Sequence, residues 1–213
     1  ETAKLTTCGN CHVGPQKQWE LSGHADAWDG LQDSGHAQAF CEGCHTVNEL
    51  GNTLTTAAGY NAVPDTRYHD VQCESCHGPG LTHVLSPADE NVPLAPMTVG
   101  LENSEGCSQC HQGSHHPFTE QWETSGHGQL NSYPAGRNGC NSCHEGGGVL
   151  KAWGENTTYL NEGELFPITC AVCHDPHGSP NSGNLRFEIG GVDSEQNLCS
   201  QCHQSRLRDP MPA

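Results

Sequence analysis

Apolar and basic side chains are scarce in this chain. Apolar residues make up 33% and aromatic residues 6% of its 213 residues, while glycine occurs 26 times. That supply of apolar side chains is too small for an ordinary protein core of this length. Lys and Arg number only 8 against 25 Asp and Glu, which gives a formal net charge of −17. This excess of acid argues against nucleic acid as a partner, because phosphates are held by basic side chains.

Long apolar runs are missing as well. The sequence has no stretch of 18 consecutive apolar residues, so it predicts no membrane span. The chain opens at Glu1 without a basic segment followed by an apolar one. We interpret it as the mature form of an exported protein, after removal of a signal peptide.

Cysteine and histidine, in contrast, follow one repeated pattern, Cys-x-x-Cys-His, which occurs seven times. The seven motifs use all 14 cysteines, in the pairs Cys8 and Cys11, Cys41 and Cys44, Cys73 and Cys76, Cys107 and Cys110, Cys140 and Cys143, Cys170 and Cys173, and Cys199 and Cys202. The histidines that end the motifs are His12, His45, His77, His111, His144, His174 and His203. Two cysteines one helical turn apart can bind one edge of a porphyrin, and the next histidine can reach its iron. The pattern therefore predicts seven covalently attached c-type haems, with these histidines as proximal ligands.

Disulfides and zinc sites are the other uses of paired cysteines. Zinc sites take four ligands and usually combine two Cys-x-x-Cys pairs. An odd number of pairs, each followed by histidine, fits that arrangement badly. Haem would also supply the missing apolar bulk, at one porphyrin for roughly 30 residues. We therefore expect a multihaem cytochrome c whose serial haem array acts as the core, in a loop-rich chain with short α-helices and little β-structure.

Short helices are predicted from Pro15 to Ser22 and from Pro117 to Ser125, because each segment begins with proline and ends before glycine. Short strands are expected at residues 149–153, 157–160 and 185–189.

A longer repeat lies over the seven motifs. The segment Gln18 to His24, which contains Trp-Glu-Leu-Ser-Gly-His, returns from Gln121 to His127 as Trp-Glu-Thr-Ser-Gly-His. The motif starts follow the same period, since Cys107 lies 99 residues after Cys8. We predict a first three-haem module over residues 1–102, a second over residues 103–192 and a terminal segment with the seventh haem over residues 193–213, all within one continuous structural unit.

Eight further histidines are candidates for the distal iron position: His24, His36, His69, His83, His115, His116, His127 and His177. His115 and His116 are neighbours, and two neighbours seldom face the same way, so we expect one of them to be a ligand. That leaves seven distal histidines for seven irons, with the pairing open. The repeat predicts equivalent roles for His24 and His127, and it suggests the same for His83 and His177.

Methionine is the alternative ligand at Met97 and Met211. No histidine follows His203, so we expect the seventh haem to take its distal ligand from upstream in the chain or from another subunit.

The Trp-x-x-Ser-Gly-His segments and the stretch from Cys73 to His83, Cys-Glu-Ser-Cys-His-Gly-Pro-Gly-x-x-His, resemble multihaem c-type cytochromes. The resemblance extends from Cys8 to His203. Among these families the chain looks most like the extracellular cytochromes that polymerise into filaments, of the OmcS and OmcE type. That resemblance implies bis-histidine haems in alternating stacked and T-shaped contacts. It also implies an extracellular or cell-surface location, with the periplasm as the alternative.

The histidine count, which can supply every sixth iron position, and the scarcity of basic residues predict long-range electron transfer rather than enzymatic turnover. The position of motifs near both ends of the chain, together with the resemblance, predicts a head-to-tail homopolymer in which His24 or His36 ligates a haem of the neighbouring subunit. Redox partner cytochromes or extracellular acceptors would complete the pathway. A soluble periplasmic shuttle is one alternative. A multihaem reductase of a small nitrogen or sulfur oxyanion is the other, but it would need an open iron position and basic residues to hold the anion.

Overall fold

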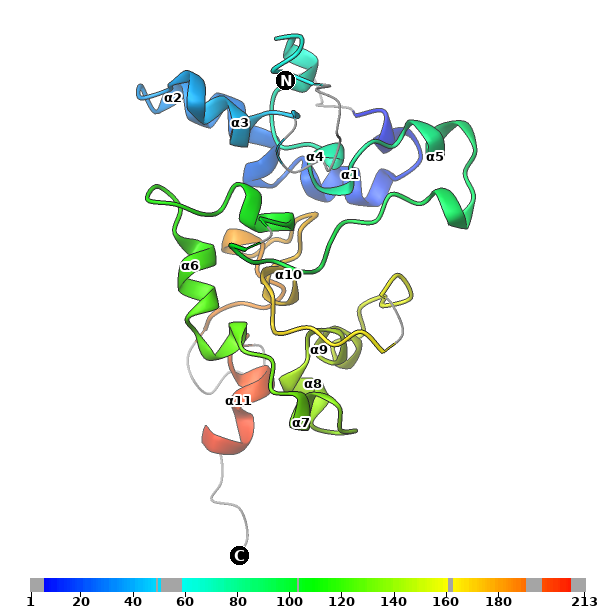
Figure 1. Ribbon diagram of the computed structural model, residues 1–213, viewed down its shortest axis with the longest axis vertical. Helices are drawn as coiled ribbons and strands as arrows, with labels where there is room; N and C mark the ends of the chain where they lie inside the picture. Colours follow the sequence, from blue (N-terminus) through cyan, green and yellow to red (C-terminus); the bar gives the residue numbers. More distant parts are fainter. Residues whose placement is uncertain are drawn as a thin grey trace, which may run out of the picture. The chain divides into compact units, whose positions relative to one another are not determined.

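The computed structural model describes residues 6–48, 50, 59–102, 104–160, 163–190 and 197–207. Short helices joined by loops make up this part of the chain (Figure 1). Its α-helices are α1 (Val13–Trp19), α2 (Ala27–Asp33), α3 (Glu42–His45), α4 (Cys73–His77), α5 (Leu81–Leu85), α6 (Phe118–Glu123), α7 (Ser132–Ala135), α8 (Asn141–His144), α9 (Gly146–Ala152), α10 (Cys170–Cys173) and α11 (Ser200–Leu207). Its 3-10 helices are Cys8–Asn10, Gly23–Asp26, Ala39–Cys41, Thr66–Tyr68, Asp89–Asn91, Gly106–Gln109, Gly126–Gly128 and Ser182–Asn184.

Extended structure in the described residues is limited to isolated bridges. These bridges join Thr46 to His69, Gly100 to Glu105, and His174 to Leu185. The prediction of a loop-rich chain with short helices and little β-structure is therefore confirmed. None of the described helices reaches the length and hydropathy that a membrane crossing requires.

The strands expected from the sequence are wrong in detail. Residues 149–152 lie in α9, because the Glu145 carboxylate caps that helix by accepting the N–H groups of Gly147 (2.9 Å) and Gly148 (2.6 Å). Satisfying these free N–H groups favours the helix over the strand propensity of Val149. Residues 157–160 form a turn, and residues 185–189 contribute only the bridge at Leu185.

The two helices expected after proline are present with shifted starts. α1 begins two residues before Pro15, at Val13, and α6 begins directly after Pro117. Both helices end before the Ser-Gly-His segment that follows them.

The chain divides into two compact units, residues 1–123 and residues 124–213. Unit 1 contains α1 to α6, and its buried apolar residues are Trp19, Ala25, Leu31 and Val47. Trp19 also donates its Nε1–H to the carbonyl of Val71 at 2.8 Å, which ties α1 to the segment before α4. These units are defined by contacts within the structure. The three-haem modules are expected from the sequence repeat, and they stay a prediction.

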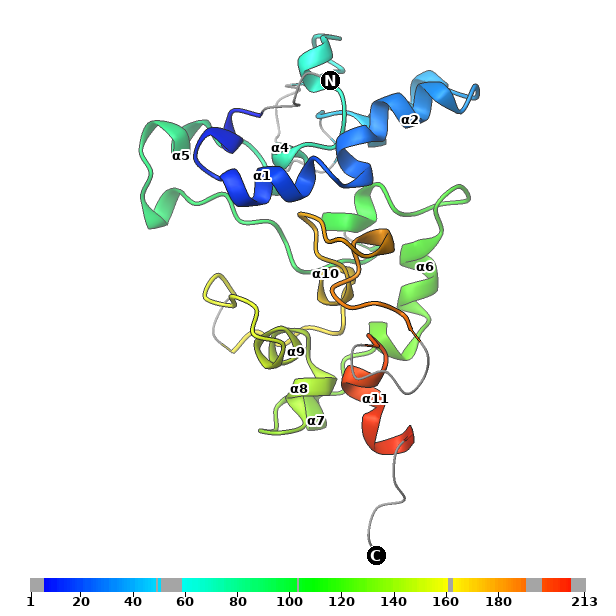
Figure 2. The same ribbon diagram turned by 180° about the vertical axis from the view of Figure 1, so that it is seen from behind.

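Unit 2 contains α7 to α11 and has a denser apolar centre. Its buried apolar residues are Ala135, Val149, Leu150, Phe166, Val172 and Leu198. α7, α8 and α9 lie together in both views (Figures 1 and 2). A Cβ atom on Gly146 would lie 2.1 Å from Cε2 of Phe166, so glycine is required where that ring packs on α9.

The internal repeat is also visible in the backbone hydrogen bonds. Val71 donates its N–H to the carbonyl of His24 at 3.1 Å in unit 1, and Ile168 donates to the carbonyl of His127 at the same distance in unit 2. Each donor lies two residues before a cysteine pair, at Cys73 and Cys170. The two Ser-Gly-His segments are therefore held by the same contact.

Candidate haem-binding site

One helical turn brings the residues of a motif together. The histidine N–H donates to the carbonyl of the first cysteine in five motifs: His12 to Cys8 (2.9 Å), His111 to Cys107 (2.9 Å), His144 to Cys140 (3.1 Å), His174 to Cys170 (2.9 Å) and His203 to Cys199 (3.0 Å). In the third motif α4 spans the whole segment from the first cysteine to the histidine. None of the 14 cysteines forms a disulfide. They are therefore available for covalent attachment of a porphyrin.

Three motif histidines are fixed by a hydrogen bond from Nδ1 to a backbone carbonyl. The acceptors are Ala27 for His45 (2.6 Å), Pro93 for His77 (2.7 Å) and Gly183 for His174 (2.5 Å). A carbonyl only accepts, so Nδ1 bears the proton and the lone pair of Nε2 is left for a metal. A hydrogen bond from the other ring nitrogen is the usual way in which metal-ligating histidines are oriented.

Three motif histidines each face a histidine from outside the motifs. The ring centroids are 6.2 Å apart for His12 and His83, 6.2 Å for His24 and His111, and 6.3 Å for His127 and His203. An iron ligated by both rings, at about 2 Å from each nitrogen with each centroid about 1.1 Å behind it, requires about 6.2 Å. The separations at the first, fourth and seventh motifs therefore match the one that a bis-histidine haem requires.

Burial supports the same fit. Burial lowers the pKa of His24, so its imidazole stays neutral, which is the form that binds a metal. Nδ1 of His83 is buried without a hydrogen-bond partner in the structure. Leaving a buried imidazole nitrogen without a partner costs folding free energy unless a metal or a hydrogen bond satisfies it.

His116 is a second neighbour of the fourth motif, since its ring lies 6.1 Å from that of His111. Its pKa is lowered, first by burial and then by the nearby His115 and His45, so it also lies close to the second motif. In unit 2 the residue equivalent to His24 is His127, and it faces the seventh motif. His24 is thus the neighbour of the fourth motif that has an equivalent in unit 2, whereas His116 lies near both the fourth and the second motifs.

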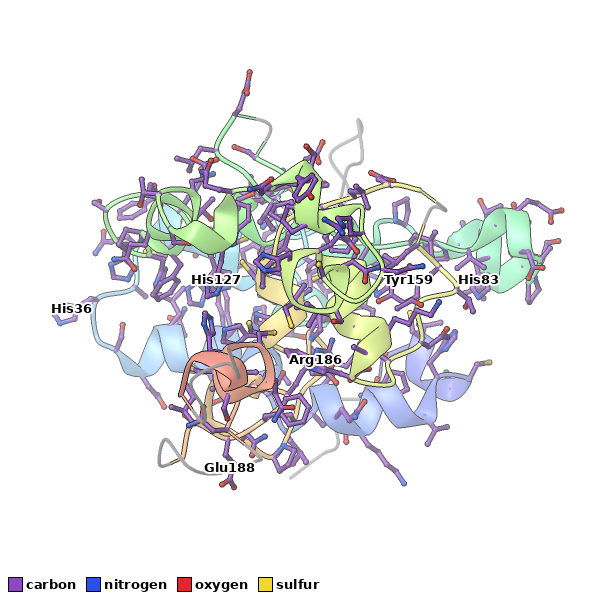
Figure 3. All side chains as sticks on the ribbon, turned by 90° about the horizontal axis from the view of Figure 1, so that it is seen from below. His36, His83, His127, Tyr159, Arg186 and Glu188 are labelled. Carbon is purple, nitrogen blue, oxygen red and sulfur yellow. The ribbon has the colours of Figure 1, made fainter. Side chains whose placement is uncertain are left out.

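The other predicted ligands lie in different surroundings. His36 is exposed and projects outward from the loop that follows α2 (Figure 3). His69 stacks on Trp28 with ring centroids 3.9 Å apart. His177 lies with Nδ1 3.7 Å from the carboxylate of Asp175, while His115 is exposed and contacts His116 edge-on at 4.5 Å. Met97 is half-buried, and Met211 lies outside the described residues.

Cysteines of different motifs also contact one another. In unit 1 a hydrogen bond between the thiols of Cys73 and Cys8 lowers the pKa of Cys73 to about 6. A hydrogen bond between Cys44 and Cys110 likewise lowers the pKa of Cys44 to about 7. In unit 2 burial raises the pKa of Cys202 to about 12, with the neighbouring Cys143 adding to the rise. Thioether sulfurs do not titrate, so in a haem protein these contacts matter because they identify neighbouring motifs.

The contacts between motifs repeat with a period of three motifs. In unit 1 the fourth motif, at Cys110, lies beside Cys44 and Cys76 of the second and third motifs. In unit 2 the seventh motif, at Cys202, lies beside Cys143 and Cys173 of the fifth and sixth. The helices concerned, α8 and α11 in unit 2, are adjacent in both views (Figures 1 and 2). Motifs that are far apart in sequence are thus neighbours in space.

Sequence reasoning missed the residues that act through the backbone. The carbonyls of Ala27, Pro93 and Gly183 orient motif histidines, and no residue type marks a carbonyl acceptor in a sequence. Sequence reasoning also did not predict which motifs His24 and His127 approach, namely the fourth at His111 and the seventh at His203. The Ser-Gly-His repeat predicted their equivalence but not their partners.

Two family models match parts of the chain. A model described as cytochrome c554 and c-prime matches residues 7–78, and a model described as the doubled CXXCH motif matches residues 161–207. The fold class of the chain is therefore that of a multihaem c-type cytochrome. Haem c is accordingly its cofactor, held through the Cys-x-x-Cys-His motifs.

Relatives point to the same class. The chain is 30% identical over 149 residues to C-type polyheme cytochrome OmcC of Geobacter sulfurreducens, over 65% of the chain and 19% of that protein. It is 25% identical over 189 residues to multiheme cytochrome MtrA of Shewanella baltica, over 78% and 52% respectively. It is 26% identical over 133 residues to cytochrome c-554 of Nitrosomonas europaea, over 49% and 54%. The chain thus spans from about a fifth to about half the length of these relatives. No solved structure matches it significantly.

Proposed function

We propose that the chain binds seven c-type haems with histidine at both axial positions and transfers electrons over a long distance. The observation that carries this proposal is the set of three facing histidine pairs, 6.2 to 6.3 Å apart, each with one motif histidine. Haem supplies one-electron redox chemistry. The chain's cysteines would hold each porphyrin, and its two histidines would occupy both axial positions, so that no position is left for a substrate.

The cysteine contacts support transfer along a series of sites. The first motif lies beside the third, and the second lies beside the fourth. The fifth lies beside the seventh in the same way. Neighbouring motifs of this kind would keep successive haems close enough for an electron to pass between them.

The haem content is the first test. We expect the intact mass of the native protein to exceed that of the chain by seven haems, and its absorption and paramagnetic-resonance spectra to be those of low-spin iron throughout. Fewer than seven haems, or a high-spin fraction in the undamaged protein, would contradict the proposal.

We also propose that copies of the chain associate head to tail as an extracellular electron-transfer filament, with His36 ligating a haem of the next copy. Unit 1 has six histidines outside the motifs for four motif histidines, whereas unit 2 has two for three. Unit 2 therefore needs a donor from outside itself. Of the two histidines expected to reach a neighbour, His24 faces His111, while His36 is exposed on a projecting loop (Figure 3). A head-to-tail contact does not close on itself, so it propagates.

The His36→Ala variant separates the filament from a monomer. We expect wild type to form filaments in negative-stain micrographs, and His36→Ala to remain monomeric with one haem in seven converted to high spin. Gln38→Ala, in the same exposed loop, is the control and should assemble normally. If wild type is a monomer with seven low-spin haems, the filament is wrong and the chain is better described as a soluble periplasmic shuttle, while electron transfer stands.

A reductase is the second candidate, and the histidine shortage of unit 2 is what favours it. An iron without a histidine at its sixth coordination position would be open to a substrate such as nitrite, hydroxylamine or tetrathionate. The guanidinium of Arg186, a cation in unit 2, is already paired with the carboxylates of Glu155 (2.8 Å) and Asp175 (3.5 Å), which argues against its holding a substrate anion. Steady reduction of one of these compounds at about 1 to 10³ per second would favour the reductase. No turnover together with no cyanide-induced spectral change would exclude it.

A further inference from the structure

Arg186 lies almost out of solvent against the sixth motif, in unit 2. Its side chain is 10% exposed. Nε and Nη2 both donate to the carbonyl of Ala171, inside the motif, at 3.3 and 3.1 Å. The backbone N–H of Arg186 donates to the carbonyl of Cys173 at 2.9 Å. The guanidinium and the backbone N–H of Arg186 thus both donate hydrogen bonds to the segment of the sixth motif. Arg186 is labelled in Figure 3.

Two carboxylates and a phenol surround the guanidinium. Nη1 lies 2.8 Å from Oε1 of Glu155 and 3.5 Å from Oδ2 of Asp175, which directly follows the motif histidine His174. The pKa of Tyr159 is raised, mainly by burial, while Arg186 opposes the rise and both carboxylates add to it. Tyr159 therefore stays neutral near pH 7, and Arg186 is the cation of this cluster.

The third motif offers an internal comparison. Its histidine, His77, has the same Nδ1 bond to a carbonyl as His174. Where the sixth motif has Ala171, the third has Glu74, whose carboxylate accepts the N–H of Gly80 at 2.9 Å. The sequence has no Lys or Arg between Arg67 and Arg137. The sixth motif therefore has a shielded cation bound to its peptide at Ala171, whereas the third motif has a carboxylate at the equivalent position, Glu74.

We propose that Arg186 raises the reduction potential of the haem at the sixth motif and holds that motif's peptide in place. The proposal depends on the proposed function in one respect, that the sixth motif binds haem. Reduction of the iron adds one electron, and a nearby positive charge stabilises the reduced form relative to the oxidised one. The effect is large only where water does not screen it, and the guanidinium is largely shielded. Arg186 is a positioning residue that touches the motif peptide.

Potentiometric titration of the native protein tests this inference. In Arg186→Gln we expect about one-seventh of the haem absorbance change to move to lower potential, since one motif of seven is affected. Arg186→Lys keeps the charge and should restore most of that shift. Arg67→Gln is the matched control near the third motif, because that side chain is 63% exposed and its charge is screened. It should leave every midpoint unchanged.

A second variant keeps the test valid if Arg186→Gln fails to fold. Glu155→Gln removes a facing carboxylate whose side chain is 40% exposed, and it should move the same one-seventh to higher potential. The inference is wrong if all midpoints are unchanged in Arg186→Gln and Glu155→Gln with seven haems bound. It is equally wrong if Arg186→Lys matches Arg186→Gln, because the charge would then have no role. A wild-type protein without haem at the sixth motif would instead overturn the proposed function.

Discussion

The two units share one arrangement but differ in how many ligands they contain. In unit 1 His24 faces His111, and in unit 2 His127 faces His203 at nearly the same separation. Both segments are held by the same backbone bond. Yet unit 1 has more histidines outside its motifs than inside them, and unit 2 has fewer. The repeat therefore maintains the geometry around the fourth and seventh motifs without maintaining the supply of ligands to the others.

The units also differ in how much of their core the protein itself provides. Among the described residues, unit 2 buries six apolar side chains and the longer unit 1 buries four. Buried apolar area is the main favourable term in folding. Unit 1 should therefore depend more on haem than unit 2.

Removal of haem is expected to have the largest effect. Chain produced without haem attachment should lose most of its helical circular dichroism and its cooperative unfolding, because the apolar side chains cannot offset the conformational entropy of folding. The last protection from hydrogen exchange should be found in α8 and α9, near Val149 and Leu150, which are 1% and 0% exposed. A folded, protease-resistant haem-free chain, or one that is best protected in unit 1, would contradict this comparison.

Removal of a distal histidine is expected to affect one haem at a time. His24→Ala and His127→Ala should each convert one haem of seven from low to high spin, because each loses one axial ligand that lies at bis-histidine distance. Paramagnetic-resonance spectra of the two variants should show high-spin signals of equal size. If only one variant changes, the two arrangements are not equivalent in the haem protein.

The sequence predicted the haem motifs and the helical, loop-rich chain because both depend on local spacing. It also predicted that His24 and His127 are equivalent, since the repeat is local too. It did not predict their partners, because the approach of His24 to His111 depends on how loops of 30 or so residues close, and many closures are compatible with one spacing. The strand expected at Val149 failed for a different reason, since capping by Glu145 is specific and stronger than propensity.

A smaller effect is expected at the residues that follow the second and fifth motifs. In unit 2 the buried carboxylate of Glu145 accepts the N–H groups of Gly147 and Gly148, so Glu145→Ala leaves both without a partner and should cost about 2 kcal/mol of unfolding free energy. In unit 1 Asn48 donates to the carbonyl of Gly43 (2.8 Å) and accepts the N–H of Leu50 (2.7 Å). Asn48→Ala should cost about 1 kcal/mol, since its bonds are between neutral groups. Denaturant titration of the haem-loaded variants measures both, and the reverse order would show that charge does not decide the difference.

The smallest effect is expected for His69→Phe. His69 in unit 1 and Phe166 in unit 2 each lie four residues before a cysteine pair, and the His69 ring stacks on Trp28 at 3.9 Å and 20°. Among the described residues no ring contact joins His69 to a motif histidine, although the sequence suggested it as a distal ligand. An aromatic ring of similar shape should preserve the stacking on Trp28 and on Tyr60, so we expect unfolding within about 1 kcal/mol of wild type. Conversion of one haem in seven to high spin would instead establish His69 as a ligand, and unit 1 would then differ from unit 2 at this position in function as well as in sequence.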